Sequence, residues 1–237
     1  YSRPGTPLEK VKGIVVHYTA NPGTTAKNNR DYFQGLKDSH ETKASSHFVV
    51  GIEGEIVQCI PSSEIAYASN SRNEDTLSIE CCHVDESGAF TDATYISLVR
   101  LTGWLCYRFN LTSEDVIRHY DVTGKNCPKY YVEHPDKWQE FKKDVDKQIQ
   151  EVEKEAKAES AQMAKIAKTK AIVEESEVNP QVIVVDTFPS THGAHQSGRF
   201  HIGSFRVAQQ SATVRFVIVK LDAIIASNTI LITYLTI

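Results

Sequence analysis

The stretch VKGIVVHY, residues 11–18, predicts a buried β-strand that carries a histidine near its end. Its apolar residues are mostly β-branched, and a short run of this kind between polar loops is typical of a strand inside a sheet. A second short strand is expected at residues 115–119, and it ends at His119. Two predicted strands therefore carry a histidine at or near their carboxyl ends. The two imidazoles can meet only if the fold brings these strand ends together.

Three more strands are expected between these two. Residues 46–51 and 55–60 are short apolar runs, and the Ile52-Glu53-Gly54 link between them favours a hairpin. Residues 76–84, TLSIECCHV, form the third run. The strand pattern is thus interrupted and resumed along the chain, as expected for a sheet whose connections include helices.

Two helices are predicted between the strands. Residues 25–36 follow a Pro-Gly breaker, with Thr24 or Thr25 as the N-cap, and residues 93–109 follow Asp92 and carry a broad apolar stripe at helical spacing. Strands that alternate with helices predict an α/β domain with a mixed central sheet flanked by helices.

Composition excludes several classes of protein. A hydrophobic fraction of 41% with 24% charged residues argues against wholesale disorder, and a net charge of -4 gives no basic field for a nucleic acid. The longest uncharged apolar run, residues 223–237, is shorter than the roughly 18 to 20 residues that cross a bilayer. We therefore expect neither a nucleic-acid partner nor membrane insertion, and the sequence leaves the oligomeric state open.

Three side chains of this sequence form a candidate metal site: His17, His119 and Cys127. Zinc favours imidazole nitrogen and thiolate sulfur, and catalytic zinc sites commonly use three protein ligands. Ligands on different strands meet only if the fold brings them together. From the residues alone the zinc site is one hypothesis, and separate structural roles for the three side chains are the other.

Four segments give this sequence a resemblance to a known family. They are VVHYTA around His17, ASSHFVV at residues 44–50, SIE at residues 78–80 and HYDVTGKNCP at residues 119–128. Their order and separations resemble the zinc-dependent N-acetylmuramoyl-L-alanine amidases, which include phage endolysins, bacterial autolysins and the related peptidoglycan-recognition proteins. The resemblance covers about residues 10–140.

The resemblance implies a role for each matching residue. By position, Glu80 matches the carboxylate that activates water, and Lys125 matches the lysine that stabilises the oxyanion. Ser46 stands where some phage members carry a tyrosine, which moves the acid–base role toward Glu80. Whether Tyr18 or Asp121 assists stays open. The implied zinc ligands are His17, His119 and Cys127.

The implied activity is hydrolysis of the amide bond between N-acetylmuramic acid and L-alanine in peptidoglycan, with Zn²⁺ as cofactor. The alternative is a non-catalytic module that binds muropeptides, although such members usually lack the cysteine ligand. A zinc deaminase is disfavoured because the sequence has neither H-x-E nor P-C-x-x-C. We expect action on the bacterial cell wall, and with no signal peptide visible, release by a route without one; a phage or bacterial origin stays open.

The chain divides into three predicted parts. Residues 1–140 form the zinc amidase catalytic domain, and residues 141–179 form a charged helical linker, with a dimerising coiled coil as the alternative. Residues 180–237 form a small β-rich segment, for which a wall-binding module, an oligomerisation element and a poorly folding end are all open. Outside the site, we expect His47 to be structural and four cysteines to be small core residues: Cys59, Cys81, Cys82 and Cys106.

Overall fold

The computed structural model of this chain describes residues 1–178 and 233–234. Contacts divide the chain into one unit of residues 1–164 with 231–237, and a second unit of residues 165–230. The sheet and the candidate site belong to the first unit. Within residues 1–178, no helix combines the length and the apolar content that crossing a bilayer requires.

The centre of the first unit is a mixed β-sheet with the strand order β5-β1-β4-β2-β3-β6. Strand β1 runs parallel to both β4 and β5, β2 runs parallel to β4, and β2 and β3 form the predicted antiparallel hairpin. Strand β6 runs parallel to β3 at the edge. The strands are β1 Gly13–Tyr18, β2 Phe48–Val50, β3 Ile56–Gln58, β4 Thr76–Cys81, β5 Val116–Arg118 and β6 Thr233–Tyr234.

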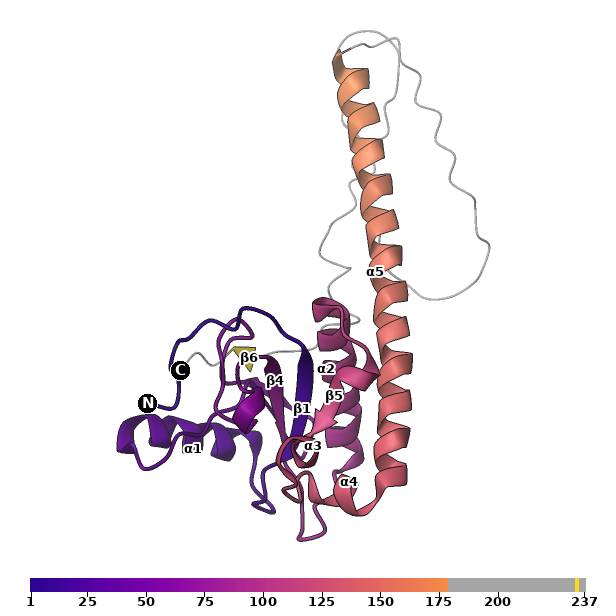
Figure 1. Cartoon of the computed structure of the whole chain (residues 1–237). Helices are drawn as coiled ribbons and strands as arrows, with labels where there is room; N and C mark the ends of the chain where they lie inside the picture. The colour runs from indigo at the N-terminus through magenta and orange to yellow at the C-terminus, as the bar shows by residue number, and fades with distance from the viewer. Residues whose placement is uncertain (179–232, 235–237) are drawn as a thin grey trace. The chain divides into compact units, whose positions relative to one another are not determined.

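Helices connect and cover these strands (Figure 1). Of the two N-cap candidates, Thr25 caps α1 by accepting a hydrogen bond from the backbone N–H of Asn28. Helix α2 begins at Asp92, one residue earlier than expected, and Thr91 caps it. The α-helices are α1 Ala26–Ser39, α2 Asp92–Phe109, α3 His119–Thr123, α4 Lys129–Glu133 and α5 Pro135–Val178, and the 3-10 turns are η1 Asn70–Arg72 and η2 Ser113–Asp115.

The two faces of the sheet pack against different helices (Figure 1). Ala26 and Phe33 of α1 pack against Val49 and Cys82 on one face. On the opposite face, Val16, Phe48 and Ile79 share one side of the sheet and are buried, and α2 contacts β2. The Tyr95 hydroxyl of α2 donates a 2.7 Å hydrogen bond to Asp144, which ties α2 to α5. The start of α5 is part of this core through Trp138, Phe141 and Val145, all of which are buried.

The mixed α/β fold with helices on both sides of the sheet confirms the fold class predicted from the sequence. The helix that includes most of the predicted linker at residues 141–179 begins earlier, at Pro135, and continues to Val178. The four cysteines predicted to be core residues are buried and unoxidised: Cys59, Cys81, Cys82 and Cys106. Most of the predicted C-terminal β-rich segment, residues 180–237, lies outside the described residues.

Candidate metal centre

Strand order places the candidate residues at one edge of the sheet. His17 of β1 is paired with Glu80 of the parallel neighbour β4, so both side chains lie on the same face. On the other side of β1, Val16 is paired with Arg118 of β5, and His119 follows directly as the first residue of α3. Because the carboxyl ends of parallel strands meet at one edge, His17, Glu80 and His119, which are far apart in sequence, become neighbours.

Cys127 reaches this edge through a tight return of the chain. Helix α3 ends at Gly124, whose φ of 77° lies in the left-handed region that favours glycine. The backbone N–H of Tyr120 then donates a 2.9 Å hydrogen bond to the carbonyl of Cys127. The loop that carries Lys125 is therefore closed on itself, and its cysteine is held beside the residue that follows His119.

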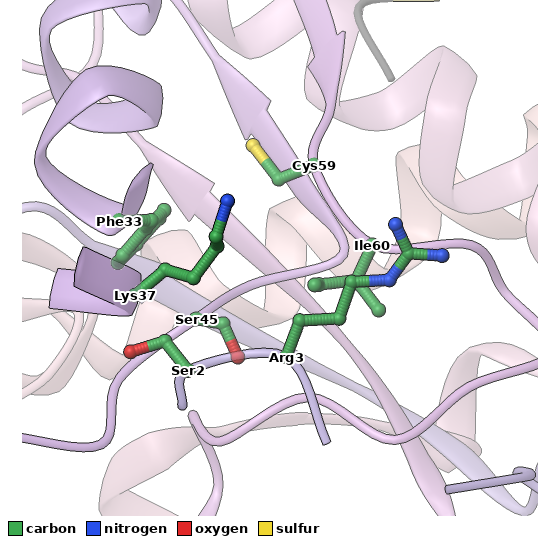
Figure 2. Close-up of a pocket in the computed structure, with 7 residues that line it drawn as sticks. All are labelled: Ser2, Arg3, Phe33, Lys37, Ser45, Cys59 and Ile60. Atoms are coloured by element: carbon green, nitrogen blue, oxygen red, sulfur yellow. The ribbon is translucent and has the colours of Figure 1, made fainter. Parts of the chain in front are cut away.

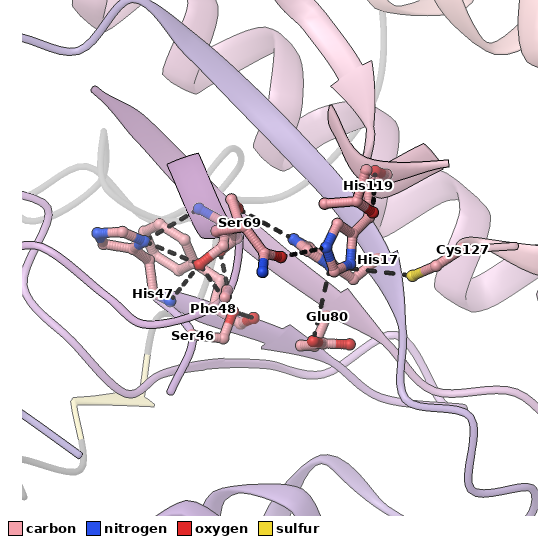
Figure 3. Close-up of polar contacts among 12 residues, drawn as sticks. His17, Ser46, His47, Phe48, Ser69, Glu80, His119 and Cys127 are labelled. Atoms are coloured by element: carbon pink, nitrogen blue, oxygen red, sulfur yellow. Dashed lines mark hydrogen bonds and ion pairs between the residues drawn. The ribbon is translucent and has the colours of Figure 1, made fainter. Parts of the chain in front are cut away.

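The three predicted ligands come together in a buried cluster (Figure 3). One ligand atom from each of His17, His119 and Cys127 lies within 4.8 Å of the others. The Cys127 Sγ lies 3.9 Å from the His17 Nδ1, and the two imidazole centroids are 4.6 Å apart. The fold thus satisfies the condition that the sequence left open.

The hydrogen bonds of the two rings show which nitrogens face the cluster. The Nε2 atoms are used elsewhere: His119 Nε2 lies 2.8 Å from Asn70 Oδ1, and His17 Nε2 lies 3.3 Å from Ser69 Oγ. The Nδ1 of His119 is buried and has no hydrogen-bond partner among the described residues. Two Nδ1 atoms and a sulfur are therefore available at one point, and this donor set suits zinc.

Burial and charge keep both imidazoles neutral at pH 7. Burial lowers the pKa of His17 well below its usual value, and the charge that His119 would carry if protonated and the positive charge of Lys125 act in the same direction. Burial also lowers the pKa of His119, again with help from Lys125. A neutral imidazole has the lone pair that a metal ligand needs, so neither ring must lose a proton before binding.

The thiol of Cys127 behaves differently. Burial and the nearby carboxylate of Glu80 raise its pKa to about 12, although the backbone N–H of Tyr18 and the charge of Lys125 act in the opposite direction. Without a cation the group is therefore a thiol. A bound divalent cation deprotonates a coordinating thiol, so metal binding here releases a proton.

Glu80 borders the cluster without being one of its three members. Its Oε1 lies 4.0 Å from the His17 Nδ1, and its Oε2 is buried with no hydrogen-bond partner among the described residues. Burial raises the pKa of Glu80 to about 8, and the charge of Lys125 acts in the opposite direction. A carboxyl group with this pKa can exchange a proton near neutral pH.

The other residues that the sequence drew attention to have structural partners. His47 is fully bonded, with Nδ1 3.0 Å from the Ser78 hydroxyl and Nε2 2.9 Å from the carbonyl of Glu64. The Ser46 hydroxyl donates to the carbonyls of Phe48 and Ser78 in the same buried region. His47 is therefore the structural histidine that the sequence predicts.

Asp121 and Tyr18 have different positions around the site. The Asp121 carboxylate accepts hydrogen bonds from the backbone N–H and the guanidinium of Arg118, so it caps α3 and its hydrogen bonds do not go to the ring of His119. The Tyr18 ring packs on His83 with centroids 5.1 Å apart. The orienting contact to His119 comes instead from Asn70, a residue that the sequence analysis did not single out.

A separate hollow near the N-terminus is too small for a substrate of any size (Figure 2). It is lined by residues that include Ser2, Phe33, Lys37 and Cys59, and its volume is about 10 Å³. This is close to the minimum that holds a single water molecule. None of its lining residues belongs to the His17, His119 and Cys127 cluster.

Comparison with known proteins agrees with the geometry. A family model described as N-acetylmuramoyl-L-alanine amidase matches residues 7–130. The chain is 38% identical over 159 residues to the N-acetylmuramoyl-L-alanine amidase CwlL of Bacillus licheniformis, and 34% identical over 166 residues to the N-acetylmuramoyl-L-alanine amidase BlyA of Bacillus subtilis. These alignments cover 62% and 61% of this chain but only 44% of each relative. The chain thus spans less than half the length of these curated relatives.

Solved structures with the same fold include a mutant endolysin from Bacillus subtilis and the catalytic domain of XlyA. The first matches with a TM-score of 0.51 at 29% identity and covers 61% of this chain and 90% of that chain. The second matches with a TM-score of 0.52 at 26% identity and covers 60% and 90%. Both likenesses extend over nearly the whole of the solved chains, so they support the fold of the unit that holds the candidate metal centre.

Proposed function

This chain belongs to the N-acetylmuramoyl-L-alanine amidase family, and we propose that it hydrolyses the amide bond between N-acetylmuramic acid and L-alanine in peptidoglycan, with zinc as its cofactor. The observation that carries this proposal is the buried cluster of His17, His119 and Cys127 at the carboxyl edge of the sheet. Its donor set is suited to zinc, and three protein ligands leave one tetrahedral position for chemistry.

In this proposal the three ligands hold the cation and the neighbouring residues manage protons and charge. Bound zinc supplies a Lewis acid that lowers the pKa of water and polarises the amide carbonyl. Glu80 takes a proton from the attacking water at its Oε2, the oxygen that has no other hydrogen-bond partner among the described residues. Glu80 then returns this proton to the leaving nitrogen, so the carboxyl group ends the reaction as it began.

Lys125 provides positive charge for the developing oxyanion. Lys125 is exposed on the loop between His119 and Cys127, and its positive charge lowers the pKa of Glu80, His17, His119 and Cys127. Attack on an amide concentrates negative charge on the former carbonyl oxygen, and a fixed cation beside a buried site stabilises that charge most effectively. This is the role that we propose for Lys125.

The experiment that tests the proposal is the product analysis of a cell-wall digest. The full chain, loaded with zinc, is incubated with purified peptidoglycan, and we expect new N-terminal alanine without new reducing sugars. Removal of zinc by a chelator should abolish product formation, and added zinc should restore it. New reducing ends would instead indicate a glycosidase and contradict the proposal.

The same samples separate hydrolysis from binding alone. A non-catalytic recognition module would retain soluble muropeptide in a sedimentation or calorimetric assay but would release no N-terminal alanine at any zinc concentration. That outcome would also contradict the proposed activity, even if the chain bound one zinc ion.

A further inference from the structure

We infer that Asn70 and Ser69 are positioning residues, which hold the imidazoles of His119 and His17 with their Nδ1 atoms directed at the metal. This inference rests on the zinc site proposed above. The two residues lie next to each other at the start of η1, in the connection between β3 and β4. Their side chains meet the two rings on the side away from Cys127, as Figure 3 shows for Ser69 and His17.

The contact from Asn70 determines the tautomer of His119. The Asn70 Oδ1 lies 2.8 Å from the His119 Nε2, and an amide oxygen can only accept a hydrogen bond. The proton of the neutral ring must therefore be on Nε2, and the lone pair must be on Nδ1. That Nδ1 is buried and has no hydrogen-bond partner among the described residues, so the lone pair is free for a cation.

Ser69 makes the corresponding contact to His17. It is 2% exposed, and its Oγ lies 3.3 Å from the His17 Nε2, on the side of the ring opposite the Nδ1 that faces Cys127 and Glu80. A hydroxyl can donate as well as accept, so this contact favours one tautomer less strictly than an amide oxygen does. We therefore expect Ser69 to contribute less than Asn70.

The turn that carries both residues is itself fixed. The Asn73 carboxamide oxygen accepts hydrogen bonds from the backbone N–H groups of Ala68 and Ser69, at 3.1 and 2.6 Å. Asn70 has a φ of 52°, in the left-handed region, where asparagine is tolerated better than most residues. A hydrogen-bond acceptor on a turn held in this way can orient a ring before the cation arrives, which lowers the cost of binding.

The test uses variants that separate the backbone requirement from the hydrogen bond. Asn70→Gly keeps the left-handed conformation at no cost but removes the acceptor, whereas Asn70→Asp keeps an acceptor oxygen in the same place. Ser71→Ala, at the exposed next position of η1, is the matched control. Zinc affinity of the full chain is measured by competition with a chromophoric chelator, and ring tautomers of the metal-free chain by ¹⁵N chemical shifts.

We expect Asn70→Gly to bind zinc about 10- to 100-fold more weakly, the usual effect of removing a partner of a ligating histidine. His119 should then populate both tautomers, while Asn70→Asp restores wild-type affinity or better and Ser71→Ala changes nothing. Wild-type zinc affinity and an unchanged His119 tautomer in Asn70→Gly would overturn the inference. Failure of the wild-type chain to bind zinc would instead overturn the proposed function.

Discussion

Two buried histidine environments lie beside this sheet, one at His47 just before β2 and one at His17 and His119 at the ends of β1 and β5, and they differ in one respect. At His47, both ring nitrogens are hydrogen-bonded, to the hydroxyl of Ser78 and the carbonyl of Glu64. At His17 and His119, only the Nε2 of each ring has such a partner, and the Nδ1 atoms face a cysteine sulfur or have none. The first environment has all its hydrogen bonds without a ligand, and the second has the donor atoms that a metal ion would need.

This difference in hydrogen bonding distinguishes His47 from His17 and His119, whereas burial and pKa do not. Burial lowers the pKa of His47 to about 4, and it lowers the pKa of His17 and His119 as well. All three rings are therefore neutral at pH 7, and charge state alone does not separate a structural histidine from a ligand. The hydrogen-bond partners of each nitrogen do distinguish His47 from His17 and His119. A nitrogen without a partner is not enough by itself, because the Nε2 of the buried His83 also has none among the described residues and His83 lies outside the cluster.

The largest expected effect comes from removing the sulfur of Cys127, the third member of the cluster with His17 and His119. Cys127→Ser should lower kcat/KM for peptidoglycan by about 10³-fold or more, because metal activation contributes several kcal/mol to such reactions. Zinc affinity should fall in parallel. The measurements are the release of N-terminal alanine and chelator competition.

The matched control is Cys106→Ala, which changes a buried cysteine of α2 that contacts the carbonyl of Thr112. This variant should keep wild-type zinc affinity. If Cys127→Ser retained wild-type hydrolysis, the assignment of the second environment as a metal centre would be wrong.

The next effect concerns the carboxylate beside the cluster. Glu80→Gln keeps the shape of the side chain but cannot accept a proton, so kcat should fall about 10²- to 10⁴-fold, as is typical for loss of a general base. Zinc should still bind, since Glu80 is not one of the three ligands. Single-turnover hydrolysis together with metal analysis of the purified variant checks both statements.

Glu74→Gln, which alters an exposed carboxylate shortly before β4, is the control and should leave kcat unchanged. Unchanged hydrolysis in Glu80→Gln would assign the proton transfers to another group. Loss of zinc from that variant would instead make Glu80 a ligand.

The smallest effect on zinc binding is expected from a change at His47, whose two ring nitrogens are both hydrogen-bonded. His47→Leu has an apolar side chain of similar size and leaves the partners of the ring with fewer hydrogen bonds, so the free energy of unfolding should fall by about 1–3 kcal/mol. Zinc affinity of the folded chain should stay at the wild-type value. Urea unfolding and chelator competition measure the two quantities, and a loss of zinc as large as that in Cys127→Ser would abolish the distinction between the two environments.

Much of the fold could be predicted from local patterns. The β-branched run before His17, the hairpin at residues 46–60 and the N-cap at Thr25 depend on short-range preferences, and the structure confirms each of them. The start of α2 differs by one residue from the expected start after Asp92, because Thr91 and Asp92 are adjacent residues that can both cap a helix. Only the hydroxyl of Thr91 accepts from the first turn, at the backbone N–H of Thr94.

The candidate site was predictable only in part, for a physical reason. His17, His119 and Cys127 are recognisable because a metal requires particular donor atoms, and this requirement is visible in the sequence. Asn70 and Ser69 only have to accept or exchange a hydrogen bond, and many polar residues can do so. In the sequence, Asn70 and Ser69 stand out only as part of a polar run at residues 69–73 before a buried strand. Their contact with the rings of His119 and His17 depends on the packing of α3 against η1, which the sequence does not show.

The pairing of β1 with β4 and β5 links the position of His17 to correct folding of the sheet. If β1 slipped by one residue, His17 would turn to the face covered by α2, and an apolar valine would replace it beside Glu80. The same error would expose hydrophobic surface and put a polar ring into the core. Misassembled molecules would therefore be both inert and easily degraded, so any molecule that survives proteolysis carries its imidazole on the correct side.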